Sequence, residues 1–126
     1  MALVPISILK PHEHIIFDNL KRVLESIVEE GQIHTPIIVD SNTLTILDGH
    51  HRVASLKLLA ATRAPVLLVD YFSDVVELDT WRPGVKVTKH QVVRAAERGV
   101  LYPPKTTRHK LRIQVPKVSV RLSDLV

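Results

Sequence analysis

The densest group of side chains capable of chemistry is the run Asp48-Gly49-His50-His51-Arg52. It falls where an apolar segment that predicts a strand, Thr43 to Leu47, gives way to a predicted helix. The first amides of a helix bind anions, and Gly49 lets the backbone approach a ligand closely. Arg52 offers donors matched to phosphate oxygens. His50 and His51 add further donors, more so if a bound phosphate favours the protonated form of their rings. The spacing predicts a phosphate site, with Asp48 placed to hold Mg²⁺ or orient a nucleophile; a glycine turn with surface histidines is the alternative.

A second cluster, Pro11-His12-Glu13-His14, follows the first apolar segment of the chain. Glu13 could act as a general base that takes the proton of an attacking hydroxyl. A polar loop with its carboxylate in solvent is the alternative interpretation. A zinc site made by His12, His14 and His50 is also conceivable, but the three histidines have no defined ligand spacing.

A third cluster lies between Pro103 and His109, where two prolines precede a dense set of hydrogen-bond donors. Its members suit a carboxylate or a phosphate; they are Lys105, Thr106, Thr107, Arg108 and His109. A solvated basic loop is again the alternative. The single tryptophan, Trp81, would usually be a core residue, but beside Arg82 and a Pro-Gly turn it could form the wall of a pocket.

Composition limits the classes of protein to consider. The 126 residues predict one domain, residues 1–126, and the lack of cysteine excludes disulfides, thiolate metal sites and cysteine nucleophiles. No apolar run approaches the ~20 residues of a membrane span, and no secretion signal is visible, so a cytoplasmic protein without membrane contact is expected. Scarce Asn, Gln and Met are a mild sign of a thermophilic source. The net charge is +4, and the segment from Lys105 to Arg121 has no acidic residue; it could meet nucleic acid, an anionic small ligand or only solvent.

These clusters must be positioned by a small set of predicted elements. Helices are expected over Asp18 to Glu30, with Asp18 as N-cap and Gly31 just past the end, over His51 to Ala60, and over Lys89 to Arg98. The last of these has Thr88 as cap, Gln91 completing a capping box and Gly99 as terminator. Strands are expected over Val4–Leu9, Pro36–Asp40, Thr43–Leu47, Pro65–Tyr71, Val75–Thr80 and around Val118–Leu122. The pattern predicts a mixed α/β (α+β) domain: a small mixed sheet with a strand–Gly–helix phosphate-binding junction.

In this order, the three clusters resemble the free serine kinases of archaea, a branch of the ParB/sulfiredoxin-like superfamily. Two further segments carry the resemblance, Val69-Asp70-Tyr71-Phe72 and Thr80-Trp81, and it extends from about Leu9 to Val126. It implies transfer of the terminal phosphate of ATP or ADP, with Mg²⁺, to the hydroxyl of free L-serine. The product would be O-phospho-L-serine, which would serve cysteine biosynthesis.

The resemblance also implies roles for particular residues. Glu13 matches the catalytic base, and Asp48 the acidic residue that works beside it with Mg²⁺. Gly49, His50, His51 and Arg52 match the segment that holds the donor phosphates. The side that receives serine is matched by Trp81 and by the residues from Lys105 to His109.

The chain departs from the family pattern at one place, and two alternative functions remain. Longer family members carry an insert between the Trp-containing strand and the last helix, where this chain has only Arg82 to Val87; this leaves open the donor nucleotide and the oligomeric state. Sulfiredoxin chemistry is excluded because it needs a cysteine. A ParB-like nucleotide-dependent DNA-binding module would need a helix-turn-helix region, and too few helical residues follow Arg98, so nucleic acid is an improbable partner. A kinase of the same fold for another small hydroxyl compound, such as threonine or homoserine, is the third possibility.

Overall fold

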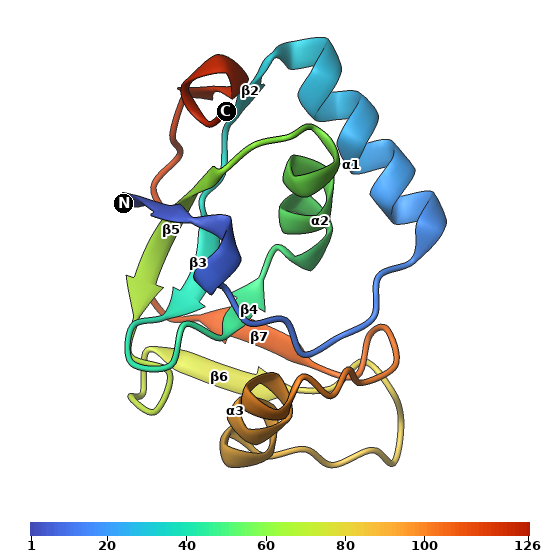
Figure 1. Cartoon of the computed structure of the whole chain (residues 1–126). Helices are drawn as coiled ribbons and strands as arrows, with labels where there is room; N and C mark the ends of the chain where they lie inside the picture. Colours follow the sequence, from blue (N-terminus) through green and yellow to red (C-terminus); the bar gives the residue numbers. More distant parts are fainter.

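A computed structural model describes all residues from 1 to 126. Its centre is a four-stranded mixed sheet in the order β1-β5-β3-β4 (Figure 1). The strands are β1 (Ala2–Pro5), β3 (Ile37–Asp40), β4 (Ile46–Asp48) and β5 (Arg63–Val69). β5 pairs parallel with β3 and antiparallel with β1, while β3 and β4 form an antiparallel hairpin. The mixed α/β domain predicted from the sequence is confirmed.

Both faces of this sheet are covered, which explains why every residue of β3 is buried. Successive strand residues point to opposite faces, so Ile37 and Val39 enter one core while Ile38 enters the other. The first core receives Ile27 from α1 (Phe17–Glu30) together with two apolar side chains from α2 (His50–Leu58).

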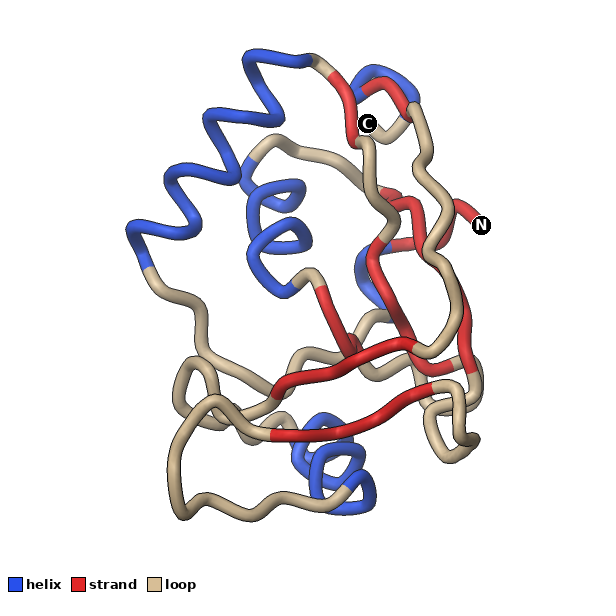
Figure 2. The backbone as a smooth tube through the Cα atoms, turned by 180° about the vertical axis from the view of Figure 1, so that it is seen from behind, coloured by secondary structure: helices blue, strands red, loops and turns tan.

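The second core is formed with α3 (Lys89–Arg98) and a separate pair of antiparallel strands, β6 (Val76–Asp79) and β7 (Arg108–Leu111). Figure 2 shows this strand pair running side by side with α3 against it. A last pair, β2 (Gln32–Ile33) with β8 (Val120–Arg121), and the 3₁₀ turn Leu122–Asp124 close the first core near the C-terminus. No helix has the length and apolar character needed to cross a membrane.

The helix signals read from the sequence are largely confirmed. α3 has the predicted bounds, a complete capping box between Thr88 and Gln91, and Gly99 in the left-handed conformation. α1 also ends at a left-handed Gly31. Its start differs from the prediction, because Ile16 occupies the N-cap position and Asp18 lies within the first turn, where its charge still complements the helix dipole.

Two predictions about strands were wrong or incomplete. The predicted strand over Val4–Leu9 is β1 followed by a 3₁₀ helix over Ile6–Ile8, closed by a hydrogen bond from Leu9 N to Ile6 O. Both of these side chains are buried, and their three-residue spacing is the period of a 3₁₀ turn. β7 was not predicted, because three of its four residues, Arg108 to Lys110, are polar; β6 supplies the pairing that they need.

Candidate active site

One large cavity, about 930 Å³, brings the three sequence clusters together. It runs from the polar face of α1, past the β4–α2 junction, to Trp81 and the loop before β7. A second cavity of about 270 Å³ adjoins it and shares Thr35, Asp48 and His109 with it. Glu13 and the first turn of α2, far apart in sequence, therefore open into the same space.

The first turn of α2 lies where the sequence predicts a phosphate site, and its amides are uncapped. Gly49, at the N-cap, has φ 112°, and no side chain caps the helix. The first intrahelical bond runs from Val53 N to Gly49 O at 3.0 Å, so the amides of His50, His51 and Arg52 have no partner within the helix. A Cβ atom at Gly49 would meet Ile37 and the Arg52 guanidinium at 3.0 Å, so the junction is also tightly packed.

Arg52 does not present a free guanidinium to a ligand, contrary to the expectation from the sequence. Its Nη1 donates to Thr35 O at 2.6 Å and to Pro36 O at 3.0 Å, and its Nη2 contacts Asp48 at 3.4 Å. Burial lowers the pKa of Arg52, although Asp48 opposes that shift. The side chain ties the start of α2 to the start of β3, while the Arg52 backbone amide has no partner within the helix.

The two histidines of α2 use their Nε2 atoms as acceptors within the protein, whereas the sequence predicts these side chains as donors to a ligand. The Nε2 atom of His50 accepts the amide of His12 at 3.1 Å, and that of His51 accepts the amide of Ile16 at 3.0 Å. A nitrogen that accepts an N–H carries no proton, so both rings are neutral and keep a proton on Nδ1. Burial lowers the pKa of both groups, further for the more deeply buried His50, and the neighbouring His12 and His109 add to the shift of His50. These rings fix the segment that carries Glu13.

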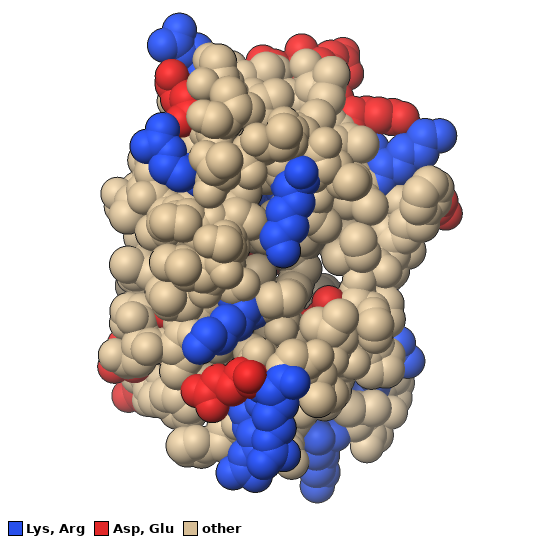
Figure 3. Space-filling view, viewed as in Figure 1, with Lys and Arg blue, Asp and Glu red and all other residues tan.

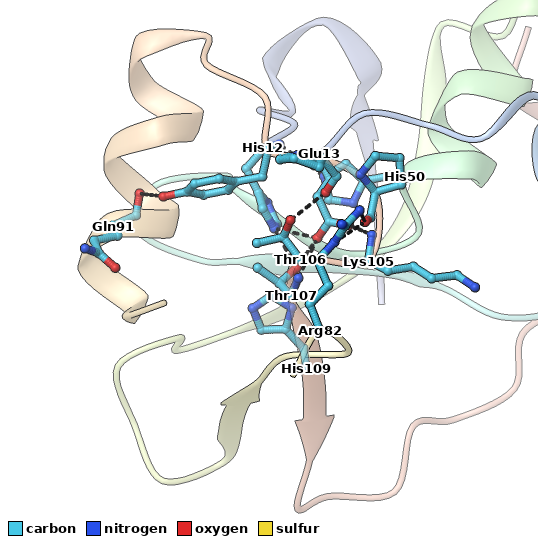
Figure 4. A network of polar contacts seen from close by, with 12 residues as sticks. His12, Glu13, His50, Arg82, Gln91, Lys105, Thr106, Thr107 and His109 are labelled. Atoms are coloured by element: carbon cyan, nitrogen blue, oxygen red, sulfur yellow. Dashed lines mark hydrogen bonds and ion pairs between the residues drawn. The ribbon is translucent and has the colours of Figure 1, made fainter. Parts of the chain in front are cut away.

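Glu13 is held by the loop that precedes β7 (Figure 4). Its Oε1 accepts the amide of Lys105 at 2.7 Å, and its Oε2 accepts the amide of Thr107 at 3.1 Å as well as the Thr107 hydroxyl. Lys105 has φ 61°, the left-handed geometry that turns successive amides toward an anion. The carboxylate is thus oriented at the cavity wall, with 12% of the side chain exposed.

Three neutral histidines form the floor beneath Glu13. The ring centroid of His12 lies 4.6 Å from that of His50 and 5.8 Å from that of His109, both edge to face. His109 Nε2 is 2.8 Å from the hydroxyl of Tyr71. Burial lowers the pKa of His12 to about 4, and burial together with His12 lowers that of His109 to about 3. Burial raises the pKa of the Tyr71 hydroxyl. The floor of the site is uncharged near neutral pH.

The far end of the cavity is built by Trp81 and Arg108. The Arg108 guanidinium lies 4.2 Å above the Trp81 ring, which is half exposed and not a core residue. Arg82 donates to Pro104 O from Nη2 at 2.7 Å and from Nε at 3.2 Å, and so ties this end to the loop before β7. The arrangement fits the predicted pocket wall.

The members of the third cluster have different surroundings. Lys105 is exposed, and Figure 4 shows its side chain extending away from the polar network. Thr106 is buried, donates its hydroxyl to Pro103 O at 2.7 Å and does not line the cavity, contrary to its expected role in substrate binding. Thr107, Arg108 and His109 do line it, although Thr107 and His109 point their polar atoms at Glu13, His12 and Tyr71.

Among the possible metal ligands, no three His, Asp or Glu side chains gather in a metal-binding arrangement, so His12, His14 and His50 do not form a zinc site. The Asp48 carboxylate is 67% exposed and opens into the cavity beside the α2 N-terminus. Magnesium is commonly held by one or two carboxylates together with substrate phosphates, and Asp48 fits that donor set.

Sequence reasoning missed the contribution of α1 to the cavity. Four of its polar side chains line one wall, at helical spacing: Asn19, Arg22, Ser26 and Glu30. The residues just after the helix line the same end of the cavity, and His34 Nε2 is 2.8 Å from Glu30 Oε2. The signal was present as polar residues three and four positions apart, but a polar helix face is the usual solvent-exposed face.

The fold and this cavity define a class of protein. The backbone superposes on a Glu-to-Ala variant of free serine kinase solved in complex with ADP, with a TM-score of 0.91, 21% identity, and coverage of 99% of this chain and 93% of that chain. The C-terminally truncated SbnI of Staphylococcus aureus gives a TM-score of 0.85 at 14% identity, over 98% of this chain and 88% of that one. The chain has the fold of free serine kinase.

Sequence comparison narrows the class to particular relatives. The ATP-dependent L-serine kinase of Staphylothermus marinus is 38% identical over 88 residues, 67% of this chain and 35% of the relative. The ADP-dependent L-serine kinase SerK of Thermococcus kodakarensis is 36% identical over 94 residues, 71% of this chain and 39% of the relative. A ParB-like protein of Sulfolobus acidocaldarius is 37% identical over 73 residues, 58% of this chain and 36% of the relative. The match thus spans well under half the length of these relatives, and no family model matches the chain.

Proposed function

We propose that this chain transfers the terminal phosphate of a nucleotide to the hydroxyl of free L-serine, giving O-phospho-L-serine. One observation carries the proposal: a single cavity joins an oriented carboxylate, Glu13, to the uncapped N-terminus of α2. Phosphoryl transfer asks a protein mainly for positioning and charge stabilisation. The names of the relatives, ATP-dependent and ADP-dependent L-serine kinase, support serine as acceptor and a nucleotide as donor.

In the proposed reaction, all the groups that bind and activate the reactants lie within residues 1–126. The amides of His50, His51 and Arg52 bind the donor phosphates at the α2 N-terminus. Glu13 takes the proton of the serine hydroxyl as its oxygen attacks the terminal phosphorus, and the bond from that phosphorus to the bridging oxygen breaks. The electron pair of that bond leaves with the shortened nucleotide. Asp48 holds Mg²⁺, which would offset the charge of the phosphates.

The acceptor end is assigned to Trp81 and Arg108. The Arg108 guanidinium provides donors for the carboxylate of serine, and stacking on the Trp81 ring fixes its orientation. The exposed Lys105 ammonium adds positive charge at the cavity rim. Of the other members of the third cluster, Thr107 holds Glu13, and His109 packs against His12 and contacts the Tyr71 hydroxyl.

A role in binding DNA has less support. Within residues 99–126 the chain forms β7, β8 and a 3₁₀ turn, and this segment contains no helix that could enter a DNA groove. On the face shown in Figure 3, Lys and Arg side chains are scattered among uncharged surface and acidic side chains, without a continuous basic band. We therefore assign nucleotide and serine, and not nucleic acid, as the partners, and the cytoplasm as the location of a reaction that consumes a nucleotide.

The test incubates the purified protein with L-serine, Mg²⁺ and either ATP or ADP, and follows O-phospho-L-serine by mass spectrometry. Product with one nucleotide only would also identify the donor. EDTA is expected to abolish product formation, and L-threonine in place of L-serine measures the strictness of the acceptor site. No product with either nucleotide, while nucleotide still binds, would reject serine kinase activity for this chain.

A further inference from the structure

Glu13 is connected to a buried histidine through one hydroxyl group. Thr107 Oγ1 donates to Glu13 Oε2 and lies 3.0 Å from Nε2 of His12, whose side chain is fully buried (Figure 4). The same Nε2 is 3.6 Å from Glu13 Oε2. The three side chains form a continuous line from Glu13 at the cavity wall to the buried His12 behind it.

The direction of these hydrogen bonds follows from counting protons. Thr107 has a single hydroxyl proton, and an ionised carboxylate can only accept, so that proton lies between Thr107 and Glu13. His12 Nε2 must then donate to Thr107, so a neutral His12 has no proton on Nδ1, although the Ile46 carbonyl lies near enough to the ring to oppose the lowering of the His12 pKa. Nδ1 of His12 is the only buried side-chain nitrogen or oxygen in the chain that has no hydrogen-bond partner. A buried acceptor without a partner costs free energy, so stability alone does not explain a histidine at this position.

The surroundings of His12 prevent it from turning. Its amide donates to His50 Nε2 at 3.1 Å, and its carbonyl accepts the amide of Tyr102 at 2.8 Å. Its ring is packed edge to face against His50 and His109, the two titratable groups that face it besides Glu13. The Thr107 hydroxyl is the hydrogen-bond partner of Nε2 at 3.0 Å, and Glu13 Oε2 lies farther away at 3.6 Å.

We propose that His12 is a positioning residue that holds the Thr107 hydroxyl as a donor to Glu13 Oε2, so that Oε1 is the oxygen that takes the substrate proton. Oε2 accepts two hydrogen bonds from Thr107, which occupy both of its lone pairs. Oε1 accepts only the amide of Lys105, and one lone pair remains for the hydroxyl of the acceptor. The assignment of this proton rests on the proposed kinase function; the orientation of the His12–Thr107–Glu13 line does not.

The first experiment compares Thr107→Val with Thr107→Ser. Valine removes the hydroxyl at nearly constant volume, and the carboxylate loses a donor that stabilises its charged form. The acid limb of the pH profile of kcat/KM should move to higher pH by about one to two units, the worth of a hydrogen bond to a charged group. Serine keeps the donor and should keep the acid limb in place. An unchanged acid limb in Thr107→Val would overturn the proposal.

The second experiment compares His12→Gln with His12→Leu. The Gln side-chain amide can place an N–H near the position of Nε2, whereas leucine has no donor. His12→Leu should move the acid limb in the same direction as Thr107→Val, and the double variant should add nothing to Thr107→Val alone. Full additivity would mean that His12 does not act through Thr107. Nucleotide affinity and thermal unfolding identify any variant that fails to fold, and His90→Leu, at an exposed histidine outside the site, is the matched control.

A measurement that needs no activity separates this proposal from the kinase assignment. Nitrogen-15 spectra of the imidazole groups, recorded near neutral pH without nucleotide, report which ring nitrogen carries the proton. The Nε2–H tautomer of His12 is expected, with a bare Nδ1, and Thr107→Val should perturb its Nε2–H signal. An Nδ1–H tautomer would overturn the proposal even if the chain makes phosphoserine; an Nε2–H tautomer would support it even if the chain does not.

Discussion

At the scale of single residues, the site depends on donors and acceptors that are already committed to one another. Arg52 and the two histidines of α2 have the residue types expected of a phosphate site, yet their side chains bind backbone atoms of the β3 start and of the segment around Glu13. Under the proposed function, backbone amides are therefore the principal ligands of the donor phosphates. Side-chain type indicates which chemistry is available, but partner choice decides which groups perform it.

Glu13→Gln provides the sharpest test at this scale. The amide keeps the shape of the carboxylate but cannot accept the serine proton, so turnover should fall by about 10²–10⁴-fold. Nucleotide affinity should change little, because the α2 amides do not contact Glu13. The measurement is kcat for phosphoserine formation beside a nucleotide titration by calorimetry. Wild-type turnover in this variant would remove Glu13 from the base role.

Asp48→Asn tests the magnesium assignment. The amide keeps a side-chain oxygen but loses the charge that would hold Mg²⁺, so the Mg²⁺ concentration needed for half-maximal activity should rise at least about tenfold. The residue is largely exposed, and its weak contact with Arg52 contributes little to stability, so unfolding should be nearly unchanged. A Mg²⁺ dependence identical to that of wild type would exclude Asp48 as a metal ligand.

At the scale of elements, the β4–α2 junction requires glycine for two reasons, the backbone conformation of Gly49 and the close packing around it. Gly49→Ala should destabilise the protein by about 2–4 kcal/mol, because φ 112° is strained for alanine and the added Cβ would meet Ile37. Gly99→Ala is the matched control: its φ is also positive, at 69°, but no atom lies within 4 Å of the added Cβ. Its cost should be about 1 kcal/mol. Equal losses in urea unfolding would show that close packing at Gly49 has no effect.

The helix ends could be predicted from the sequence, whereas several strands and one wall of the cavity could not. The capping box of α3 and the left-handed glycines after α1 and α3 are local signals, and each was predicted correctly. β2 and β7 pair with strands far away along the chain, and the wall formed by α1 depends on the elements that face it. β2 is too short, and β7 and this face of α1 are too polar, for the sequence to predict a paired or buried segment. Glu13 was recognised as a candidate base, but the Thr107 contacts that orient it join segments more than ninety positions apart.

At the scale of the whole molecule, the neutral histidine floor links stability to pH. The pKa of His12 is lowered to about 4 and that of His109 to about 3, so in the pH range below 6.5 the unfolded chain binds more protons than the native one. Stability should be complete above pH 6.5 and should fall as the pH drops toward 4. Each of the two groups contributes about 1.4 kcal/mol per pH unit in that range.

Urea unfolding at several pH values between 4.5 and 7 measures this dependence. Replacement of His109 by Phe, which cannot be protonated, should reduce the slope of stability against pH, whereas His90→Leu should leave it unchanged. A slope that is the same in wild type and in His109→Phe would show that protonation of the floor does not limit stability in acid.

Trp81, finally, makes the acceptor end of the cavity visible to spectroscopy. The chain has no other tryptophan, and this one is half exposed with the Arg108 guanidinium stacked on its ring. Any anion that draws Arg108 away alters the polarity and quenching of a single, assignable fluorophore. The intrinsic emission of the unmodified protein therefore reports binding at the acceptor end, and amino acids that bind there can be ranked by titration before any turnover is measured.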